Sequence, residues 1–380
     1  MWIDLNFNLL TYITLSAATL SLLIQMAYYW GLFSRLAFFK SKNINNTDNE
    51  DLPAVSVVIS ARNAVLDLEK NLPYILYQDY PRFEVVVVND SSDDGTEELL
   101  TELARYEPKL NIVHIRQNLN FFHGKKFPLS LGIKSAKNDL LLFTDADCRP
   151  TSDRWIRSMV SHYHQQTEIV IGYGPYAGAK GLLGFLQRFD TLQIAMLYLS
   201  KALAGKPYMG VGRNLSYLKS LFMDNKGFIA HYNIPSGDDD LFIQQVANKR
   251  NCRVALEKTS FTFSEPEKTF SSWIRQKRRH LTTGKYYKPG IKFQLSLFAF
   301  TQFSFYASLV VLLILCIHPV FPAGLFLLHY TQQLILFGKS CKTLNEKFPF
   351  YLIPFAEIFF IIFNPTLIFI NSFSKPVKWM

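Results

Sequence analysis

Two aspartates, Asp145 and Asp147, directly follow an apolar run and are the first side chains in the chain that could do chemistry. The run, Leu140–Phe143, has no polar alternation, which predicts a strand buried on both faces of a sheet. At the carboxyl end of such a strand, two acids would stand where an open α/β sheet receives its ligand. Paired carboxylates suit Mg²⁺ or Mn²⁺, whose coordination substrate phosphates and water complete. A turn that merely favours Asp is the competing interpretation.

A second acidic cluster, Asp238–Asp240, is harder to explain as simple surface chemistry. Three adjacent acids repel one another, whereas capping a helix needs only one of them. A carboxylate held near a phosphate-bearing metal site can act as a general base toward a substrate hydroxyl. The cluster is therefore a candidate for the base, with helix capping as the alternative.

Polar side chains also follow three other predicted elements. Ser60 and Arg62 come at the end of one β-branched run, and Asp90 ends the next. An Asp in that position can accept hydrogen bonds from a nucleoside base or a ribose, or it can cap the following helix. Gly124 and Lys125 precede another helical pattern, where a lysine at a helix start can neutralise phosphate or face solvent.

A basic helix is expected over Trp273–His280. In a helix, Trp273, Gln276 and His280 share one face, with Arg279 at its edge. Such a helix can contact an anionic substrate, and it can equally lie at a membrane surface, where each positive charge contributes about 1 kcal/mol with anionic lipids.

The elements that must position these residues alternate between strand and helix. This alternation predicts βαβ units and a mostly parallel sheet, and hence an α/β, Rossmann-like domain. The expected strands are Val55–Ser60, Phe83–Asn89, Asn111–Ile115, Leu140–Phe143, Glu168–Tyr173 and Arg253–Leu256. The expected helices are Leu66–Tyr77, Thr96–Tyr106 and Lys125–Ala136. An amphipathic helix over Gly181–Gly205 would cover the sheet or lie at a membrane surface.

Composition narrows the class of protein further. Of the 380 residues, 49% are hydrophobic and 33 are Phe, which favours a membrane protein over a soluble one. The formal net charge of +10 would also fit a nucleic-acid binder. The basic residues, however, cluster beside the apolar segments, so we expect no nucleic acid. The four cysteines form no CxxC pair, so neither a disulfide framework nor a structural zinc site is expected.

Apolar segments at both ends predict transmembrane helices. Leu9–Phe33 carries no charge and is long enough to cross about 30 Å of hydrocarbon. Further candidates are Phe293–Ile317 and Ala323–Gly338. Because Pro354, Glu357 and Pro365 interrupt the segment 350–373, we expect a re-entrant or interfacial hairpin there.

The positive charges that follow the first segment place the next residues in the cytoplasm. The expected organisation is a membrane helix at 1–34, a polar linker at 35–52, a cytoplasmic domain at 53–289 and a membrane region at 290–380 with two or three hydrophobic segments. The protein would then be integral to the inner (plasma) membrane of a bacterium, in contact with membrane lipids.

Taken together, these motifs resemble glycosyltransferase family 2 over roughly residues 53–285. VSVVISARN, followed by QDYPRFEVVVVNDSSDDGT, is very close to the opening of that family, and the later motifs come in the same order. The resemblance implies a nucleotide-sugar-binding GT-A fold and inverting transfer from a nucleotide-diphosphate sugar, with a UDP-sugar preferred, to a lipid-linked or glycan acceptor. The product would belong to cell-surface polysaccharide or glycolipid synthesis.

The resemblance also assigns roles to single residues. Asp90 would contact the base with help from Ser60 and Arg62, Lys125 would contact the diphosphate, and Asp145 with Asp147 would hold Mg²⁺ or Mn²⁺. Asp238 would be the general base. Gln276, Arg279 and His280 would lie near the acceptor and the diphosphate.

Two departures from the family pattern matter. Gly237 stands where the family usually has Glu, which keeps Asp239 as an alternative base. His280 stands where Trp is usual, and this weakens the alternative of a processive polysaccharide synthase coupled to export. Outside this class, a nucleotidyltransferase or a non-catalytic membrane protein are the remaining candidates.

Overall fold

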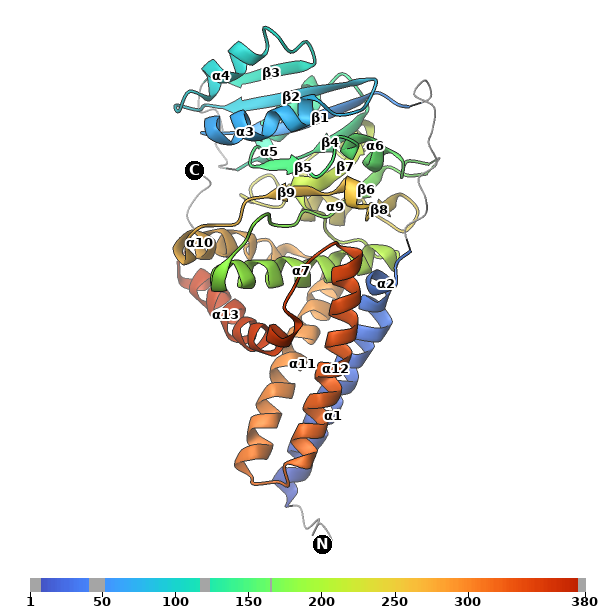
Figure 1. Ribbon diagram of the computed structural model, residues 1–380, viewed down its shortest axis with the longest axis vertical. Coiled ribbons are helices and arrows are strands. Elements are labelled where there is room, and N and C mark those ends of the chain that lie inside the picture. The colour runs from blue at the N-terminus through green and yellow to red at the C-terminus, as the bar shows by residue number, and fades with distance from the viewer. Residues whose placement is uncertain (1–7, 41–51, 117–123, 165, 375–380) are drawn as a thin grey trace. The chain divides into compact units, whose positions relative to one another are not determined.

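The computed structural model describes residues 8–40, 52–116, 124–164 and 166–374. These residues form two compact units, shown in Figure 1. The first, here called the sheet unit, lies within Lys40–Tyr287. The second, the helical unit, combines residues of Met1–Phe39 with Lys288–Phe373. Most of the linker expected at 35–52 lies outside the described residues.

A seven-stranded sheet in the order β3-β2-β1-β4-β7-β6-β8 organises the sheet unit. Its strands are β1 (Val55–Ala61), β2 (Phe83–Asp90), β3 (Leu110–Ile115), β4 (Leu140–Phe143), β6 (Ile169–Ile171), β7 (Leu215–Leu218) and β8 (Cys252–Val254). Only β7 runs antiparallel to its neighbours, β4 and β6. The predicted α/β class with a mostly parallel sheet is therefore confirmed.

The central strands form where apolar, β-branched runs can be buried on both faces. Every residue of β1, β2 and β4 is buried. Helices connect and cover the strands: α3 (Val65–Leu76), α4 (Thr96–Leu103), α5 (Lys126–Ser135), α6 (Trp155–Val160), α8 (Lys219–Asp224) and α9 (Asp240–Val246). Sequence reasoning missed β7 because its four residues, LSYL, carry too short a pattern to stand out.

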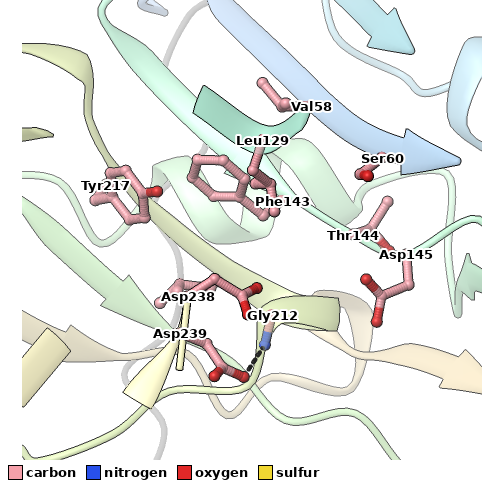
Figure 2. Close-up of a pocket in the computed structure, with 11 residues that line it drawn as sticks. Val58, Ser60, Leu129, Phe143, Thr144, Asp145, Gly212, Tyr217, Asp238 and Asp239 are labelled. Atoms are coloured by element: carbon pink, nitrogen blue, oxygen red, sulfur yellow. Dashed lines mark hydrogen bonds between the residues drawn. The ribbon is translucent and has the colours of Figure 1, made fainter. Parts of the chain in front are cut away.

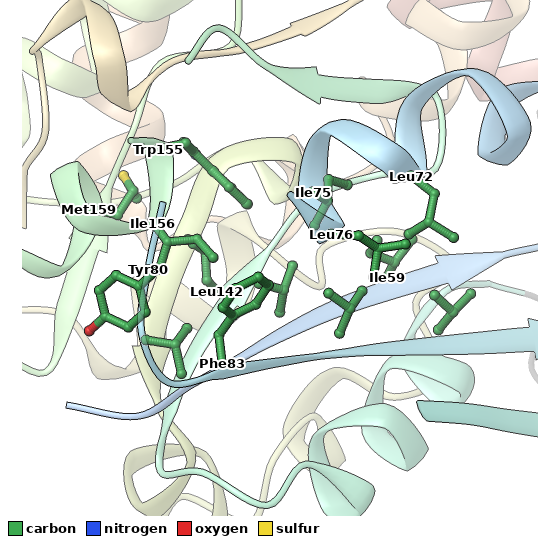
Figure 3. Packing of buried hydrophobic residues seen from close by; sticks show 14 of the residues in the cluster. Ile59, Leu72, Ile75, Leu76, Tyr80, Phe83, Leu142, Trp155, Ile156 and Met159 are labelled. Carbon is green, nitrogen blue, oxygen red and sulfur yellow. The ribbon is translucent and has the colours of Figure 1, made fainter. Parts of the chain in front are cut away.

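One hydrophobic core joins the sheet to its helices, and Figure 3 shows part of it. Ile59 and Leu142 of the sheet pack with Leu72 of α3 and Trp155 of α6. Fully burying one large apolar side chain stabilises the fold by about 1.5–3 kcal/mol. On α5, Gly132 allows close approach, because a Cβ there would overlap side chains of β1 and β2. These contacts hold the ends of β1, β2 and β4 in place.

The remaining elements of the sheet unit are α7 (Gly181–Leu203), α10 (Phe270–His280) and the two antiparallel strands β5 (Cys148–Pro150) and β9 (Thr262–Ser264). The expected amphipathic helix is α7, and it packs within the sheet unit. The hydroxyl group of Tyr198 donates to the carbonyl of Gly172, 2.9 Å away, just beyond β6. This contact favours the interpretation in which the helix covers the sheet.

The helical unit contains four helices that are long and apolar enough to cross a membrane, judged by length and composition. They begin with α1 (Leu9–Met26), which continues through the π-helix η1 (Ala27–Phe33) into α2 (Ser34–Ala37). The others are α11 (Pro289–Ile314), α12 (Val320–Thr343) and α13 (Ile353–Phe373).

The hairpin expected near the C-terminus is wrong, because α13 is one continuous helix with Pro365 inside it. A proline removes only its own N–H from the helical hydrogen bonds, and helices of apolar sequence can tolerate that loss. The helix α12 also extends to Thr343 instead of ending at Gly338.

Glu357 of α13 is buried in the helical unit, with only 1% of its surface exposed. Its carboxylate accepts hydrogen bonds from Gln302 and Tyr306 of α11, both at 2.7 Å. The hydroxyl of Tyr29 and the ring nitrogen Nε2 of His329 each lie 3.4 Å away. This carboxylate therefore joins all four apolar segments of the unit.

Candidate active site

Three neighbouring parallel strands end at buried polar oxygens that have no hydrogen-bond partner among the described residues. They are Ser60 Oγ on β1, Asp90 Oδ2 on β2 and Thr144 Oγ1 directly after β4. All three side chains are at least nine-tenths buried. An unpaired buried polar group costs about 1–3 kcal/mol, so native proteins keep such groups mainly where a ligand will pair with them. This carboxyl edge of the sheet is where α/β folds bind ligands.

The surroundings of Asp90 disfavour its ionised form. Burial raises the pKa of its carboxyl group, and the nearby Arg62 acts in the opposite direction. The structure therefore brings Ser60, Arg62 and Asp90 to one edge, as the sequence predicted. Thr144 was missed, because a lone Thr at a strand end carries no signal of its own.

Asp145, Asp147 and Cys148 form a group whose ligand atoms all lie within 4.8 Å of one another, and it is the group among the described residues that could hold a metal ion. The thiol of Cys148 donates to Asp147 Oδ1 at 3.3 Å. Burial raises the pKa of Cys148 well above its usual value, so the sulfur stays protonated. A hard cation such as Mg²⁺ or Mn²⁺ would use the carboxylates instead. The residues present thus fit the expected cation.

The pKa values of the two aspartates shift in opposite directions. Lys125 Nζ lies 2.6 Å from Asp145 Oδ1. Burial acts to raise the pKa of Asp145, but Lys125, Arg213 and Arg279 outweigh it and lower the pKa. For Asp147, burial and then the charge of Asp145 raise the pKa. A cation shared by both carboxylates would relieve this repulsion.

The three aspartates Asp238–Asp240 have different partners, and Figure 2 shows two of them. Asp239 caps α9: its carboxylate accepts from the backbone N–H of Asp240 at 2.8 Å and of Gly212 at 2.9 Å. Asp240 accepts from the hydroxyl of Tyr287 at 2.6 Å. Asp238 lines a pocket with Asp145 and Ser60. Burial raises the pKa of Asp238.

The basic helix α10 is anchored through α7. Lys277 Nζ lies 2.8 Å from both carboxylate oxygens of Asp190 on α7, and both side chains are buried. Gln187 of α7 exchanges two hydrogen bonds with the backbone of Glu267, just before α10. Lys277 is thus committed to an internal ion pair and is not one of the charges that α10 could offer to lipids.

This anchoring brings the end of α10 to the acidic site. Gln276 Oε1 lies 3.4 Å from the hydroxyl of Tyr176, which donates to it. Arg279 is close enough to lower the pKa of Asp145. Desolvation, followed by the charge of Arg279 and other cations, lowers the pKa of His280 to about 3, although the residue is exposed. His280 therefore presents a neutral imidazole at neutral pH.

Comparison with known proteins shows which family this part of the chain matches. Residues 56–224 match the family model described as Glycosyl transferase family 2. The chain carries a family 2 glycosyltransferase domain. The predicted family is therefore confirmed.

Two curated relatives show the range of similarity of this chain. It is 31% identical over 133 residues to 4,4'-diaponeurosporenoate glycosyltransferase from Staphylococcus haemolyticus, covering 34% of each protein. It is 22% identical over 265 residues to poly-beta-1,6-N-acetyl-D-glucosamine synthase from Staphylococcus aureus strain COL, covering 67% of this chain and 62% of the relative. The chain thus spans between about a third and less than two thirds of the length of these relatives.

A solved structure supports the fold. Mannosyltransferase PcManGT from Pyrobaculum calidifontis, in complex with GDP-Man and Mn²⁺, aligns with a TM-score of 0.58 at 19% sequence identity. The alignment covers 88% of this chain and 99% of the mannosyltransferase. The chain therefore has the expected GT-A fold.

Sequence reasoning missed Arg213, which the fold of this glycosyltransferase places beside the acidic pair. Its Nε donates to the carbonyl of Gly174 at 2.9 Å, and its guanidinium lies 5.4 Å from the ring centre of Tyr176. A Cβ at Gly174 would overlap Arg213, so the glycine makes room for it. The only sequence signal was the pair of glycines at 210 and 212, which is too weak to indicate a site.

Proposed function

We propose that this chain is a membrane-anchored, inverting glycosyltransferase that transfers a sugar from a nucleotide-diphosphate sugar to a lipid-linked or glycan acceptor. The leading donor class is a UDP-sugar, and the product would belong to cell-surface polysaccharide or glycolipid synthesis. The observation that carries the proposal is the row of unpaired, buried oxygens at Ser60, Asp90 and Thr144, next to a pocket shared by Asp145 and Asp238.

Donor binding would use the carboxyl edge of the sheet. Ser60, Arg62 and Asp90 would hold the nucleoside, because two of them offer unpaired buried oxygens there. Asp145 and Asp147 would hold Mg²⁺ or Mn²⁺, which when bound would offset negative charge on the diphosphate.

Charge that develops on the leaving diphosphate needs fixed positive partners. Lys125, Arg213 and Arg279 all act on Asp145 and therefore surround the same space. Burial opposes a charged Lys125, but Asp145 and the other nearby acids raise its pKa, so it stays protonated. Cations oriented before the reaction stabilise such a transition state without a reorganisation cost.

Asp238 would remove the proton from the acceptor hydroxyl as that oxygen attacks the anomeric carbon opposite the diphosphate. The proton moves to the carboxylate, the new glycosidic bond forms, and the bond to the diphosphate breaks with its electron pair. One displacement inverts the anomeric centre. Asp239 fits this role less well, because one of its oxygens caps α9 and the other accepts from the backbone N–H of Gly212. Gln276 and His280 would contact the acceptor.

The four apolar helices support anchoring at a membrane. We place the catalytic domain on the cytoplasmic side of a bacterial inner membrane, because lysines and an arginine follow the first apolar segment. A lipid-linked acceptor would then reach the enzyme from the membrane itself.

A processive synthase is the second candidate, favoured by the similarity to the poly-beta-1,6-N-acetyl-D-glucosamine synthase. The length of the product separates the two candidates: single additions support the first, and polymers support the second.

The proposal is tested with membranes that contain the full chain. UDP- and GDP-sugars are offered one by one, and released nucleoside diphosphate is measured with and without EDTA. We expect one donor class to release nucleoside diphosphate in an EDTA-sensitive reaction. Release of pyrophosphate would instead indicate a nucleotidyltransferase, and no nucleotide binding at all would indicate a non-catalytic membrane protein.

A further inference from the structure

Lys126 follows Lys125 directly, but its side chain has entirely different partners. Lys126 is 3% exposed, and its Nζ donates to the backbone carbonyls of His231 at 2.7 Å, Ile234 at 2.9 Å and Ser236 at 2.9 Å. An ammonium group has three N–H donors, so these bonds use all of them. A buried lysine saturated by backbone carbonyls is not a solvated surface residue.

The loop that Lys126 holds leads straight to the proposed base. Ser236, the last carbonyl in the clamp, lies two residues before Asp238. Gly237 between them has a φ of +95°, and a Cβ there would overlap Leu241. The chain between the clamp and the carboxylate therefore has little room to adjust. Where Lys126 holds the loop, it also sets the position of Asp238.

A second contact holds the same loop from the same segment. A Cβ on Gly124 would overlap the carbonyl oxygen of Pro235. The backbone at Gly124 and the ammonium of Lys126 thus contact neighbouring parts of one loop. Between them, Lys125 contacts Asp145 at 2.6 Å.

We propose that Lys126 is a positioning residue that sets the distance between the donor diphosphate and the base Asp238. This inference rests on the proposed function. Because Lys125 and Lys126 are adjacent at the start of α5, one short segment contacts both Asp145 on the donor side and the loop that leads to Asp238. Lys125 faces the donor side, and Lys126 holds the loop that carries the base.

The charge of Lys126 is consistent with this role. Burial lowers its pKa to about 8, while Asp238 and its two acidic neighbours act to raise it. Burying a lysine is costly unless its donors are paired, and here three backbone carbonyls pair all three donors of Lys126.

The experiment uses the full chain in membrane vesicles with Lys126→Met and Gly124→Ala. The control is Lys134→Met, an exposed lysine on the same helix. UDP and GDP with Mn²⁺ probe nucleotide affinity. Radiolabelled UDP-GlcNAc and GDP-mannose report transfer to lipid or polymer, and hydrolysis to free sugar.

We expect both variants to bind nucleotide with wild-type affinity but to transfer sugar about 10²-fold more slowly, the scale of a misplaced reacting group. Hydrolysis should fall much less, because a water molecule can adjust its position and an acceptor cannot. The ratio of transfer to hydrolysis should therefore drop in both variants and stay unchanged in Lys134→Met. This ratio does not depend on how much of the enzyme is folded.

A wild-type ratio in Gly124→Ala would overturn the inference, and so would a proportional loss of transfer and hydrolysis in both variants. If Lys126→Met folds poorly, Gly124→Ala still tests the inference, because it keeps the ammonium and displaces the loop at Pro235. Failure of the proposed function would show differently: the wild-type chain itself would bind neither UDP nor GDP.

Discussion

Two buried polar sites, one in each unit, differ in how their polar groups are paired. At the carboxyl edge of the sheet, oxygens of Ser60, Asp90 and Thr144 are buried without a partner among the described residues. In the helical unit, the carboxylate of Glu357 has Tyr29, Gln302, Tyr306 and His329 around it. The first arrangement lowers stability, and the second raises it.

The difference shows which polar groups serve a ligand and which serve the fold. A saturated carboxylate such as Glu357 has no capacity left for a substrate, and it holds the helices of its unit together. The unpaired oxygens of Ser60, Asp90 and Thr144 can gain a hydrogen bond only from a ligand or a water molecule that enters the site. Substitutions should therefore change activity without stability in one region, and stability first in the other.

The largest effect on activity is expected at Asp238. Asp238→Asn removes a carboxylate that lines the pocket and neither caps a helix, as Asp239 does, nor pairs with Lys125, as Asp145 does, so transfer should fall by about 10²-fold or more. Nucleotide binding and the thermal unfolding temperature should stay near wild type, because the amide has the same shape. Transfer rate, UDP affinity and unfolding are measured on the same preparation.

Asp239→Asn is the matched control for Asp238→Asn. Asn is as good a helix cap as Asp, so transfer should change only a few-fold. If Asp239→Asn abolishes transfer and Asp238→Asn does not, the base is Asp239 and the assignment made here is wrong.

Stability should respond most at Glu357. Glu357→Ala leaves several buried donors without an acceptor, which should lower the free energy of unfolding by about 3 kcal/mol. Thermal unfolding in detergent measures this loss, and Glu357→Gln, which keeps one acceptor oxygen, should lose less. Wild-type stability of Glu357→Ala would remove the contrast between the two units.

In contrast to Glu357→Ala, Asp90→Asn should weaken nucleotide binding without loss of stability, and the effect should be smaller. Losing the carboxylate should weaken nucleotide binding about tenfold, or about 1.4 kcal/mol. The unfolding temperature should stay equal or rise, because burial raises the pKa of this carboxyl group and its ionised form is destabilised in the fold. Titration with UDP and a thermal scan separate the two effects; a marked loss of stability would mean that Asp90 supports the fold.

The smallest effect concerns pH. Burial raises the pKa of Asp238, so this carboxylate takes up a proton at a higher pH than a free aspartate does. Transfer should therefore be present above that raised pKa and be lost as the pH falls through it, while nucleotide affinity changes less. Rate profiles of the wild type and Asp238→Glu check this, and an acid limb that tracks nucleotide binding would assign the titration to the donor site.

Much of this protein could be recognised from its residues in order. The apolar runs of β1, β2 and β4 identify strands buried on both faces, because the runs carry no polar alternation. Asp90, Asp145 and Asp147 follow such strands, and the ends of parallel strands necessarily meet at one edge. The apolar segments at both ends identify helices long and apolar enough to cross a membrane for a similar reason: a single local property, length without charge, decides them.

Only the tertiary structure decided which neighbours in sequence share a task. Asp238 and Asp239 are the same residue type and adjacent in sequence, but the backbone N–H of Gly212 donates its hydrogen bond to Asp239. Lys125 and Lys126 diverge because one faces Asp145 and the other a distant loop. Arg213 becomes part of the site only when Gly174 comes beside it. Such contacts join residues far apart in the chain, so no local pattern encodes them.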